Sequence, residues 1–216
     1  VQTEIRRGRP PQAILEYADA QDVDLVAMGT HGRTGIDRYV LGSVTEAVVR
    51  SVEVPVLTAR ATGRSRVADG YEDVLLPTDG SEYAAVAFEH GIAIARAFGA
   101  RVHAVNVVNV ADLAPRPEAE PGDAVLESFE TAGETATAEI ASQASDAGLD
   151  AVTAVREGRP ARSLLDYADE QGIGLIAMGT AGRTGPSRYL LGSTTERIIR
   201  HAGVPVLAVN ARGATD

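Results

Sequence analysis

The chain contains a long internal repeat. Aligned without gaps at an offset of 150, positions 1–60 and 151–210 are identical at 31 of 60 places. The most similar stretch reads GTHGRTGIDRYVLGSV at 29–44 and GTAGRTGPSRYLLGST at 179–194. A repeat this similar predicts that both copies fold alike, so a structure assigned to one must suit the other. It constrains the fold more than any other feature of the sequence.

The repeat unit alternates between strands and helices. In the second copy a β-rich run at 151–158 precedes a helix that Pro160 opens, and the apolar run GLIAM at 174–178 is typical of a buried parallel strand. A glycine loop follows, then a helix after Ser193 and a closing strand at 204–209. We expect the first copy to have the same order: strand, helix, strand, glycine loop, helix, strand.

The segment between the copies occurs only once. Its predicted elements are a strand at 73–80 that ends in a turn, an amphipathic helix at 81–99, a strand at 101–108, a Pro-rich acidic loop at 109–123 and a helix at 124–147. Together with the second copy, this segment alternates β and α five times. That alternation predicts an α/β fold with a doubly wound parallel sheet.

The first copy lacks a counterpart of 73–147, so it corresponds to half a domain. The expected organisation is a half-domain at 1–61, a linker at 62–71, a complete domain at 72–210 and a tail at 211–216. A half-domain alone has unpaired strand edges. It could be completed by residues preceding Val1, by another molecule, or by competing for the 73–147 half. We favour the first of these.

Composition excludes several classes of function. All 20 basic residues are Arg, so a Walker-type phosphate loop and Schiff-base catalysis, which both need Lys, are ruled out. Cysteine is absent, and the four His have no metal-ligand spacing. A net charge of −10 argues against binding nucleic acid or anionic lipid. No apolar run is long enough to span a membrane, and we expect a cytoplasmic protein, acidic like those of salt-loving microbes.

The glycine loop carries a family resemblance. A spacing of Gly, two residues, Gly, nine residues, Gly-Ser occurs twice, at Gly29, Gly32, Gly42 and Ser43, and at Gly179, Gly182, Gly192 and Ser193. With LLPTDGSEYA near a domain start and a closing VPVL strand, it closely resembles the ATP-binding branch of the universal stress protein family. The resemblance implies an open five-stranded parallel sheet in the order 3-2-1-4-5, like that of adenine nucleotide α-hydrolases. It also implies a ligand site where the first and fourth strands meet.

The resemblance implies ATP as ligand, with Mg²⁺ held through the phosphates rather than by protein side chains. The residues that would bind the nucleotide are Pro77, Thr78, Asp79, Val107, Met178, Gly179, Gly182, Gly192, Ser193 and Thr194. Glycines let backbone N–H groups approach phosphate, and a helix start favours an anion. The equivalents in the first copy are Met28, Gly29, Gly32, Gly42, Ser43 and Val44. Nucleotide binding there is the weaker expectation, because the Asp-bearing strand is missing.

Each of these residues also has a purely structural interpretation. Ser193 with Glu196, and Ser43 with Glu46, form capping-box patterns that could serve only to start a helix. The glycines could serve tight turning alone, and Asp79 could cap a turn. Arg183 and Arg188 (Arg33 and Arg38 in copy one) could reach phosphates or be solvated, and His31 is replaced by Ala181 in the second copy.

The function expected from these features is a nucleotide-dependent regulatory protein rather than an enzyme. The alternatives are a nucleotide-free interaction module and, less favoured, a slow ATP hydrolase, because no nucleophile–base pair is apparent. The resemblance further implies a homodimer or a tandem pseudo-dimer that pairs through the terminal strands at 54–59 and 204–209.

Overall fold

The computed structural model describes residues 1–30, 41–60, 70–109, 123–181 and 191–211. Gly32, Gly182, His31 and the four loop arginines lie outside this part. The elements contributed by the first copy are α1 (Pro10–Ala20), β1 (Val26–Gly29), α2 (Ser43–Ser51) and β2 (Val56–Ala59). The unrepeated segment contributes β3 (Asp73–Thr78), α3 (Glu82–Ala85), α4 (Phe88–Phe98), β4 (Arg101–Val108) and α6 (Asp123–Asp146). The second copy contributes β5 (Ala151–Glu157), α7 (Pro160–Glu170), β6 (Leu175–Gly179), α8 (Ser193–His201) and β7 (Val206–Val209).

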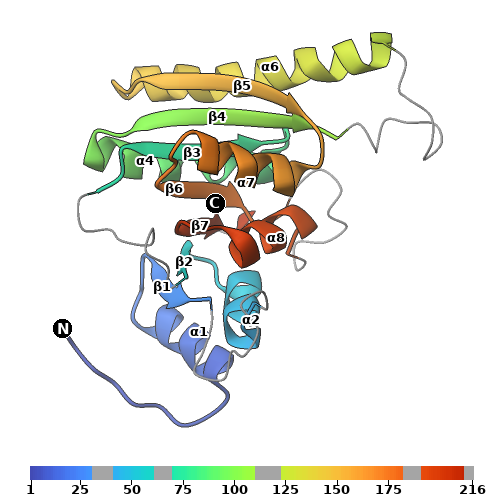
Figure 1. Ribbon diagram of the computed structural model, residues 1–216. Coiled ribbons are helices and arrows are strands. Elements are labelled where there is room, and N and C mark those ends of the chain that lie inside the picture. The colour runs from blue at the N-terminus through green and yellow to red at the C-terminus, as the bar shows by residue number, and fades with distance from the viewer. Residues whose placement is uncertain (31–40, 61–69, 110–122, 182–190, 212–216) are drawn as a thin grey trace.

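The described strands form one sheet in the order β1-β2-β7-β6-β3-β4-β5 (Figure 1). All neighbours run parallel except β2 and β7, which are antiparallel. The α/β class and the mostly parallel sheet predicted from the sequence are confirmed. Within the complete domain the five strands β5-β4-β3-β6-β7 are parallel and follow the order 3-2-1-4-5. The five-stranded sheet is corrected in one respect: β2 and β1 of the half-repeat continue it, so the described part of the chain has one mixed sheet of seven strands.

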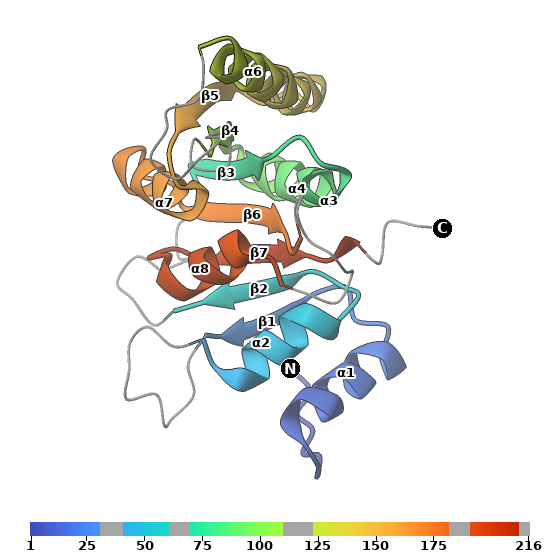
Figure 2. The same cartoon turned by 90° about the vertical axis from the view of Figure 1, so that its right-hand side faces the viewer.

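The two copies meet through their last strands. Leu57 of β2 lies opposite Leu207 of β7, and the hydroxyl of Thr58 donates to the carbonyl of Val206 across this junction. The tandem pairing expected for these strands is therefore present within one chain. Pro55 and Pro205 each lie just before their strand, where a missing N–H removes no ladder bond. Figure 2 shows the strands stacked in this order, with α6 at one end and α1 at the other.

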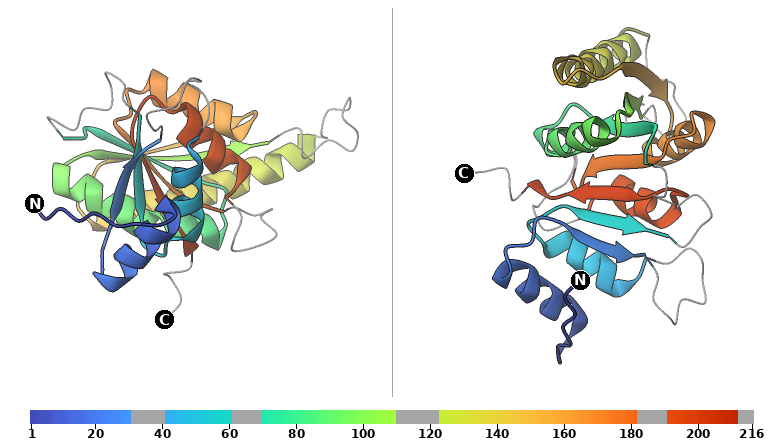
Figure 3. Two further views of the ribbon diagram at one scale, coloured as in Figure 1. Left: turned by 90° about the horizontal axis from the view of Figure 1, so that it is seen from below. Right: turned by 90° about the vertical axis from the view of Figure 1, so that its left-hand side faces the viewer.

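Helices cover the sheet in two layers, and each layer encloses a hydrophobic cluster. One cluster joins α7, α8, α1 and α2, with Ile198, Ile199, Val48 and Val49 at its centre. The other lies under α3, α4 and α6 and includes Leu76, Leu175 and Ile140. The two faces of the twisted sheet can be followed in Figure 3. In the described residues no helix is long and apolar enough to cross a membrane.

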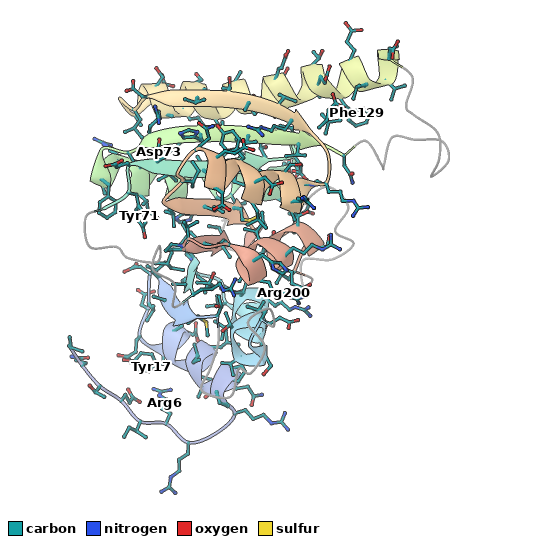
Figure 4. The ribbon with its side chains drawn as sticks, viewed as in Figure 1. Arg6, Tyr17, Tyr71, Asp73, Phe129 and Arg200 are labelled. Atoms are coloured by element: carbon teal, nitrogen blue, oxygen red, sulfur yellow. The ribbon has the colours of Figure 1, made fainter. Side chains whose placement is uncertain are left out.

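Copy one departs from the repeat at its start. Residues 1–9 form no strand, although the equivalent 151–157 form β5, so the expected first strand is wrong. The physical reason is that β5 pairs with β4, and the first copy has no counterpart of β4. The local contact of the repeat nevertheless persists, because Arg6 stacks on Tyr17 as Arg156 stacks on Tyr167. Figure 4 shows Arg6 beside Tyr17 near α1.

The helix predicted at 81–99 is interrupted. Ser81 does begin it, since its hydroxyl accepts the N–H of Ala84, but α3 ends at Ala85 and α4 starts at Phe88. Gly91 explains the close approach of α4 to the sheet, because a Cβ there would lie 2.2 Å from Leu76 Cδ2. The helix ends at Gly99, whose φ of 65° is the left-handed conformation that favours glycine.

Candidate functional site

Three strands end at the same edge of the sheet. β3 lies between β4 and β6, and the chain runs outward from β3 on one side before crossing to β6 on the other. This reversal is the topological switch point at which open α/β sheets bind ligands. The residues predicted from the sequence to bind a ligand lie at or just beyond these carboxyl ends, so the structure brings together the described members of the second-copy set.

The end of β3 is held by a side chain that sequence reasoning missed. Asn106 of β4 is buried and donates from Nδ2 to the carbonyl of Thr78, 2.8 Å away. Thr78 in turn accepts the N–H of Gly80 on its hydroxyl at 3.0 Å. Gly133 makes room for this arrangement, because a Cβ there would lie 2.6 Å from Asn106 Oδ1. A polar residue within the buried part of β4 was the available signal.

Asp79 shapes the turn after β3. Its Oδ1 accepts the N–H of Ser81 at 3.0 Å and the hydroxyl of Ser81 at 2.5 Å. Because the same hydroxyl accepts the N–H of Ala84, Asp79 supports the first turn of α3 through Ser81. The turn-capping interpretation of Asp79 is therefore confirmed, and its contact with a nucleotide stays a prediction.

Gly179 lies against a backbone. A Cβ at this position would lie 2.0 Å from the carbonyl oxygen of Tyr83 and 3.3 Å from Ala84 Cα. Any side chain here forces α3 away from the end of β6. Gly179 is therefore required for packing, whatever else approaches it.

At position 192, unlike position 179, the structure does not require a glycine. It is the N-cap of α8 with φ −61° and ψ 141°, a conformation open to any residue. The atom nearest to a Cβ would be the Thr180 carbonyl oxygen at 3.3 Å, which a shift of a few tenths of an ångström would relieve. Neither backbone strain nor severe crowding explains a glycine here.

The start of α8 is not a capping box. Ser193 belongs to the first turn rather than the N-cap, and no side chain accepts a hydrogen bond from the N-terminal N–H groups in the described residues. Glu196 instead pairs with Arg200 one turn later, as Glu46 pairs with Arg50 in α2. The capping-box interpretation of both copies is therefore wrong. Ser193 is exposed and Thr194 half-buried, so this end of the helix faces outward from the core.

Val107 and Met178 lie near the carboxyl ends of β4 and β6, on the face of the sheet that α7 and α8 cover. Both belong to the apolar cluster under α7 and α8, in which Met178 is buried and Val107 partly buried. Pro77 is buried in β3. Of these three residues Val107 keeps some apolar surface beside the polar turn of Asp79. Gly182 lies outside the described residues.

The first copy reproduces the glycine geometry without the neighbouring strands. Gly42 is the N-cap of α2 with φ −60°, and its N–H donates to the Thr30 carbonyl at 2.9 Å. Ser43 is exposed and Val44 half-buried, as in the second copy. Met28 and Gly29 end β1, which is an edge strand with Gly29 exposed. The chain has no counterpart of Pro77, Thr78, Asp79 or Val107 beside them.

A buried polar cluster lies at the opposite end of the strands. His103 is 1% exposed, and its Nδ1 lies 2.8 Å from the Tyr167 hydroxyl and its Nε2 2.8 Å from Asp73 Oδ1. The imidazole ring therefore bridges the tyrosine hydroxyl and the carboxylate. Arg101 also donates to Asp73, at 2.7 Å. Figure 4 places Asp73 where β3 and β4 begin.

A cavity of about 390 Å³ opens beside this cluster, away from the carboxyl ends. Its lining residues are Glu72, Asp73, Gly99, Ala100, Arg101, Gly148, Leu149 and Asp150. Burial alone would raise the pKa of Asp73, but the hydrogen bonds and charges of Arg101 and His103 outweigh it and hold that pKa below its ordinary value. Among the described residues no group of three or more His, Asp or Glu could hold a metal ion.

Asp73→Asn is expected to make the protein less stable at neutral pH and less sensitive to acid. A carboxylate whose pKa is lowered by folding contributes stability above its unfolded pKa of about 3.9, and that contribution is lost as pH falls through the folded value. We expect a loss of about 1 kcal/mol at pH 7 that shrinks as pH falls below the unfolded pKa and through the folded one. Urea unfolding from pH 3 to 7 measures it, with the exposed Asp24→Asn as control. A difference that stays constant with pH would contradict the assignment.

Comparison with known proteins agrees with the sequence resemblance. The model of the universal stress protein family matches residues 1–60 and 70–210. A universal stress protein of Methanocaldococcus jannaschii is 37% identical over 139 residues, covering 64% of this chain and 82% of that protein. One from Mycolicibacterium smegmatis is 27% identical over 218 residues, covering 98% of this chain and 69% of that protein.

Solved structures show the same fold over both copies. A universal stress protein from Archaeoglobus fulgidus, 25% identical, superposes with a TM-score of 0.65 over 97% of this chain and 68% of its own length. A universal stress protein from Lactobacillus plantarum, 26% identical, has a TM-score of 0.54 and covers 65% of this chain and 98% of its own length. The longer match includes the half-domain, and the shorter one corresponds in extent to a single complete domain.

Proposed function

Because the chain belongs to the universal stress protein family, we propose that it binds ATP where β3, β4 and β6 end and acts as a nucleotide-dependent regulatory protein. The phosphates would lie against Gly179, Gly192, Ser193 and Thr194; Gly182, which the sequence also assigns to the phosphates, lies outside the described residues. The adenosine would lie against the residues of β3 and β4 that end at the same edge, with Met178 from β6. Mg²⁺ would be held through the phosphates, whose charge it would offset.

The observation that carries this proposal is the start of α8. Its first N–H groups have no side-chain cap among the described residues, and its N-cap is a glycine that the backbone conformation does not require. Free N–H groups and the helix dipole favour an anion at this position. A side chain on Gly192 would lie against the Thr180 carbonyl and the Thr195 hydroxyl, where the first turn of α8 meets the end of β6. The residues present therefore fit a bound phosphate.

The neighbouring strand ends fit the rest of a nucleotide. Asn106 and Ser81 hold Thr78 and Asp79 in a fixed turn, which lowers the entropy lost when a ligand is bound there. Val107, which is only partly buried, offers apolar surface of the kind that packs on a base. The first copy has the phosphate side of this arrangement without the adenosine side, so we propose one nucleotide for each chain.

We propose binding with slow hydrolysis at most. The site residues include one carboxylate, Asp79, and no histidine or cysteine that could form a nucleophile–base pair with it. Turnover below about one per minute is expected, against about 1–1000 per second for typical enzymes. Binding would favour one arrangement of the surface around the end of β6 and the start of α8, which a partner could distinguish.

The first test is the nucleotide that copurifies with the chain. The purified protein is heat-denatured and the released nucleotide identified by chromatography and mass, followed by calorimetric titration of emptied protein with Mg-ATP. About one ATP per chain is expected. Gly192→Val should abolish binding, because the valine fits the backbone but fills the space at the helix start.

Gly42→Val is the matched control, since it makes the same change at the start of α2. It should leave the stoichiometry at about one. Two nucleotides per wild-type chain would show that the first copy also binds. No nucleotide, and no heat of binding with Mg-ATP, would overturn the proposal and favour the nucleotide-free interaction module.

A further inference from the structure

A buried threonine hydroxyl joins the end of β6 to the start of α8. Thr195, the third residue of α8, is 3% exposed and donates to the carbonyl of Gly179 at 2.9 Å. One step further along the chain, the N–H of Gly192 donates to the carbonyl of Thr180 at 2.7 Å. These two bonds hold the first turn of α8 against the last residues of β6 and Thr180.

The bond of Thr195 is not helix capping. A capping hydroxyl accepts an N–H of its own helix, whereas this one donates backward to the preceding strand. The acceptor residue, Gly179, also packs closely against α3, because the backbone of α3 at Tyr83 leaves no room for a Cβ on Gly179. The chain from α3 through Gly179 to Thr195 therefore links the turn of Asp79 to the first turn of α8.

We propose that Thr195 is a positioning residue for the bound nucleotide: it holds Gly179 and the first N–H groups of α8 at the separation that the phosphates need. The inference rests on the proposed function and assigns Thr195 no contact with the ligand. Preorganisation of this kind raises affinity because less conformational freedom is lost on binding.

The first copy provides a matched control within the same chain. Thr45 is likewise 3% exposed and donates to the carbonyl of Gly29 at 2.8 Å, and the N–H of Gly42 donates to Thr30. The bond is the same, but none of the described strands pairs with the open edge of β1. A purely structural role predicts that removing either hydroxyl has the same consequences. A positioning role predicts that only Thr195 matters for nucleotide binding.

The experiment compares Thr195→Val, Thr195→Ser and Thr45→Val in the full chain, titrated with Mg-ATP. Valine keeps the shape of threonine and removes the hydroxyl, while serine keeps the donor. We expect Thr195→Val to raise the Kd about tenfold, which corresponds to about 1.4 kcal/mol. Thr195→Ser and Thr45→Val should stay within about twofold of the wild type. The midpoints of thermal unfolding should fall alike in the two valine variants.

Two results would overturn the proposal: a Kd for Thr195→Val equal to that of the wild type, or an equal loss of affinity in Thr45→Val. Amide hydrogen exchange at Gly192, measured without nucleotide, separates this failure from that of the proposed function. The exchange should be faster in Thr195→Val and unchanged in Thr195→Ser and Thr45→Val. A wild type that binds no ATP refutes the proposed function and the positioning role with it. Unchanged exchange in Thr195→Val shows that the Thr195 hydroxyl does not hold the start of α8, and this refutes the positioning role alone.

Discussion

Leu175→Ala is expected to lower the free energy of unfolding by about 3 kcal/mol, whereas Leu25→Ala, the same change at the equivalent repeat position, should cost less than about 1 kcal/mol. Leu175 is 0% exposed, and Leu25 is 45% exposed. Both residues come at the start of an equivalent strand, so local sequence does not explain the difference. β3 pairs alongside Leu175 and α4 packs on the same face of β6, while the chain has no counterpart of either for Leu25.

Urea unfolding followed by circular dichroism measures both losses. The comparison requires that the unfolding free energy depends on urea concentration with the same slope in both variants. Because the half-domain and the complete domain share a cluster, the transition should be fitted with and without an intermediate. Comparable losses in the two variants would contradict the prediction. That outcome would mean that the Leu25 side chain is covered in solution.

Gly179→Ala is expected to have the second large effect. The added methyl would lie 2.0 Å from the carbonyl oxygen of Tyr83, which belongs to backbone and cannot rotate away. We expect a loss of about 3 kcal/mol in the free energy of unfolding, the upper part of the range for overpacking. Amide hydrogen exchange of Ala84, which the Ser81 hydroxyl protects, should become faster as α3 moves. Affinity for Mg-ATP should fall with it, because the turn of Asp79 is attached to α3 through Ser81.

Gly29→Ala is the control for this variant. Gly29 is exposed, and among the described residues no counterpart of α3 lies against it. Its unfolding free energy and nucleotide stoichiometry should stay close to those of the wild type. If the two alanine variants were equally stable, the contact between Gly179 and α3 would not be a close one in solution.

Much of the fold could be predicted from local patterns. The strand at the apolar run 174–178, the helix start at Ser81 and the helix at 124–147 all depend on residues close together in sequence, and the structure has them within one or two positions. The same patterns misled at the start of α8, where Ser193 and Glu196 fit a capping box. Arg200 was the stronger partner for Glu196, and Gly192 took the N-cap.

The candidate site likewise contains residues that local patterns reveal and residues that they do not. The glycine spacing and the aspartate after β3 could be read directly, because each lies within a short motif. Asn106 and Thr195 could not, because their partners Thr78 and Gly179 are 28 and 16 residues away. The cluster of His103, Asp73 and Tyr167 was missed for the same reason, since it joins two strands and a helix that meet only in the folded chain.

The repeat shows what the sequence by itself determined and what only the tertiary structure decided. Alternating strands and helices, the glycine at each helix start and the stacking of Arg6 on Tyr17 follow from residues near one another in the chain, so both copies have them. Burial does not follow in this way. Tyr167 is buried against His103, and Tyr17 is half-exposed, because burial depends on the strands and helices that pack nearby, and these come from distant parts of the chain.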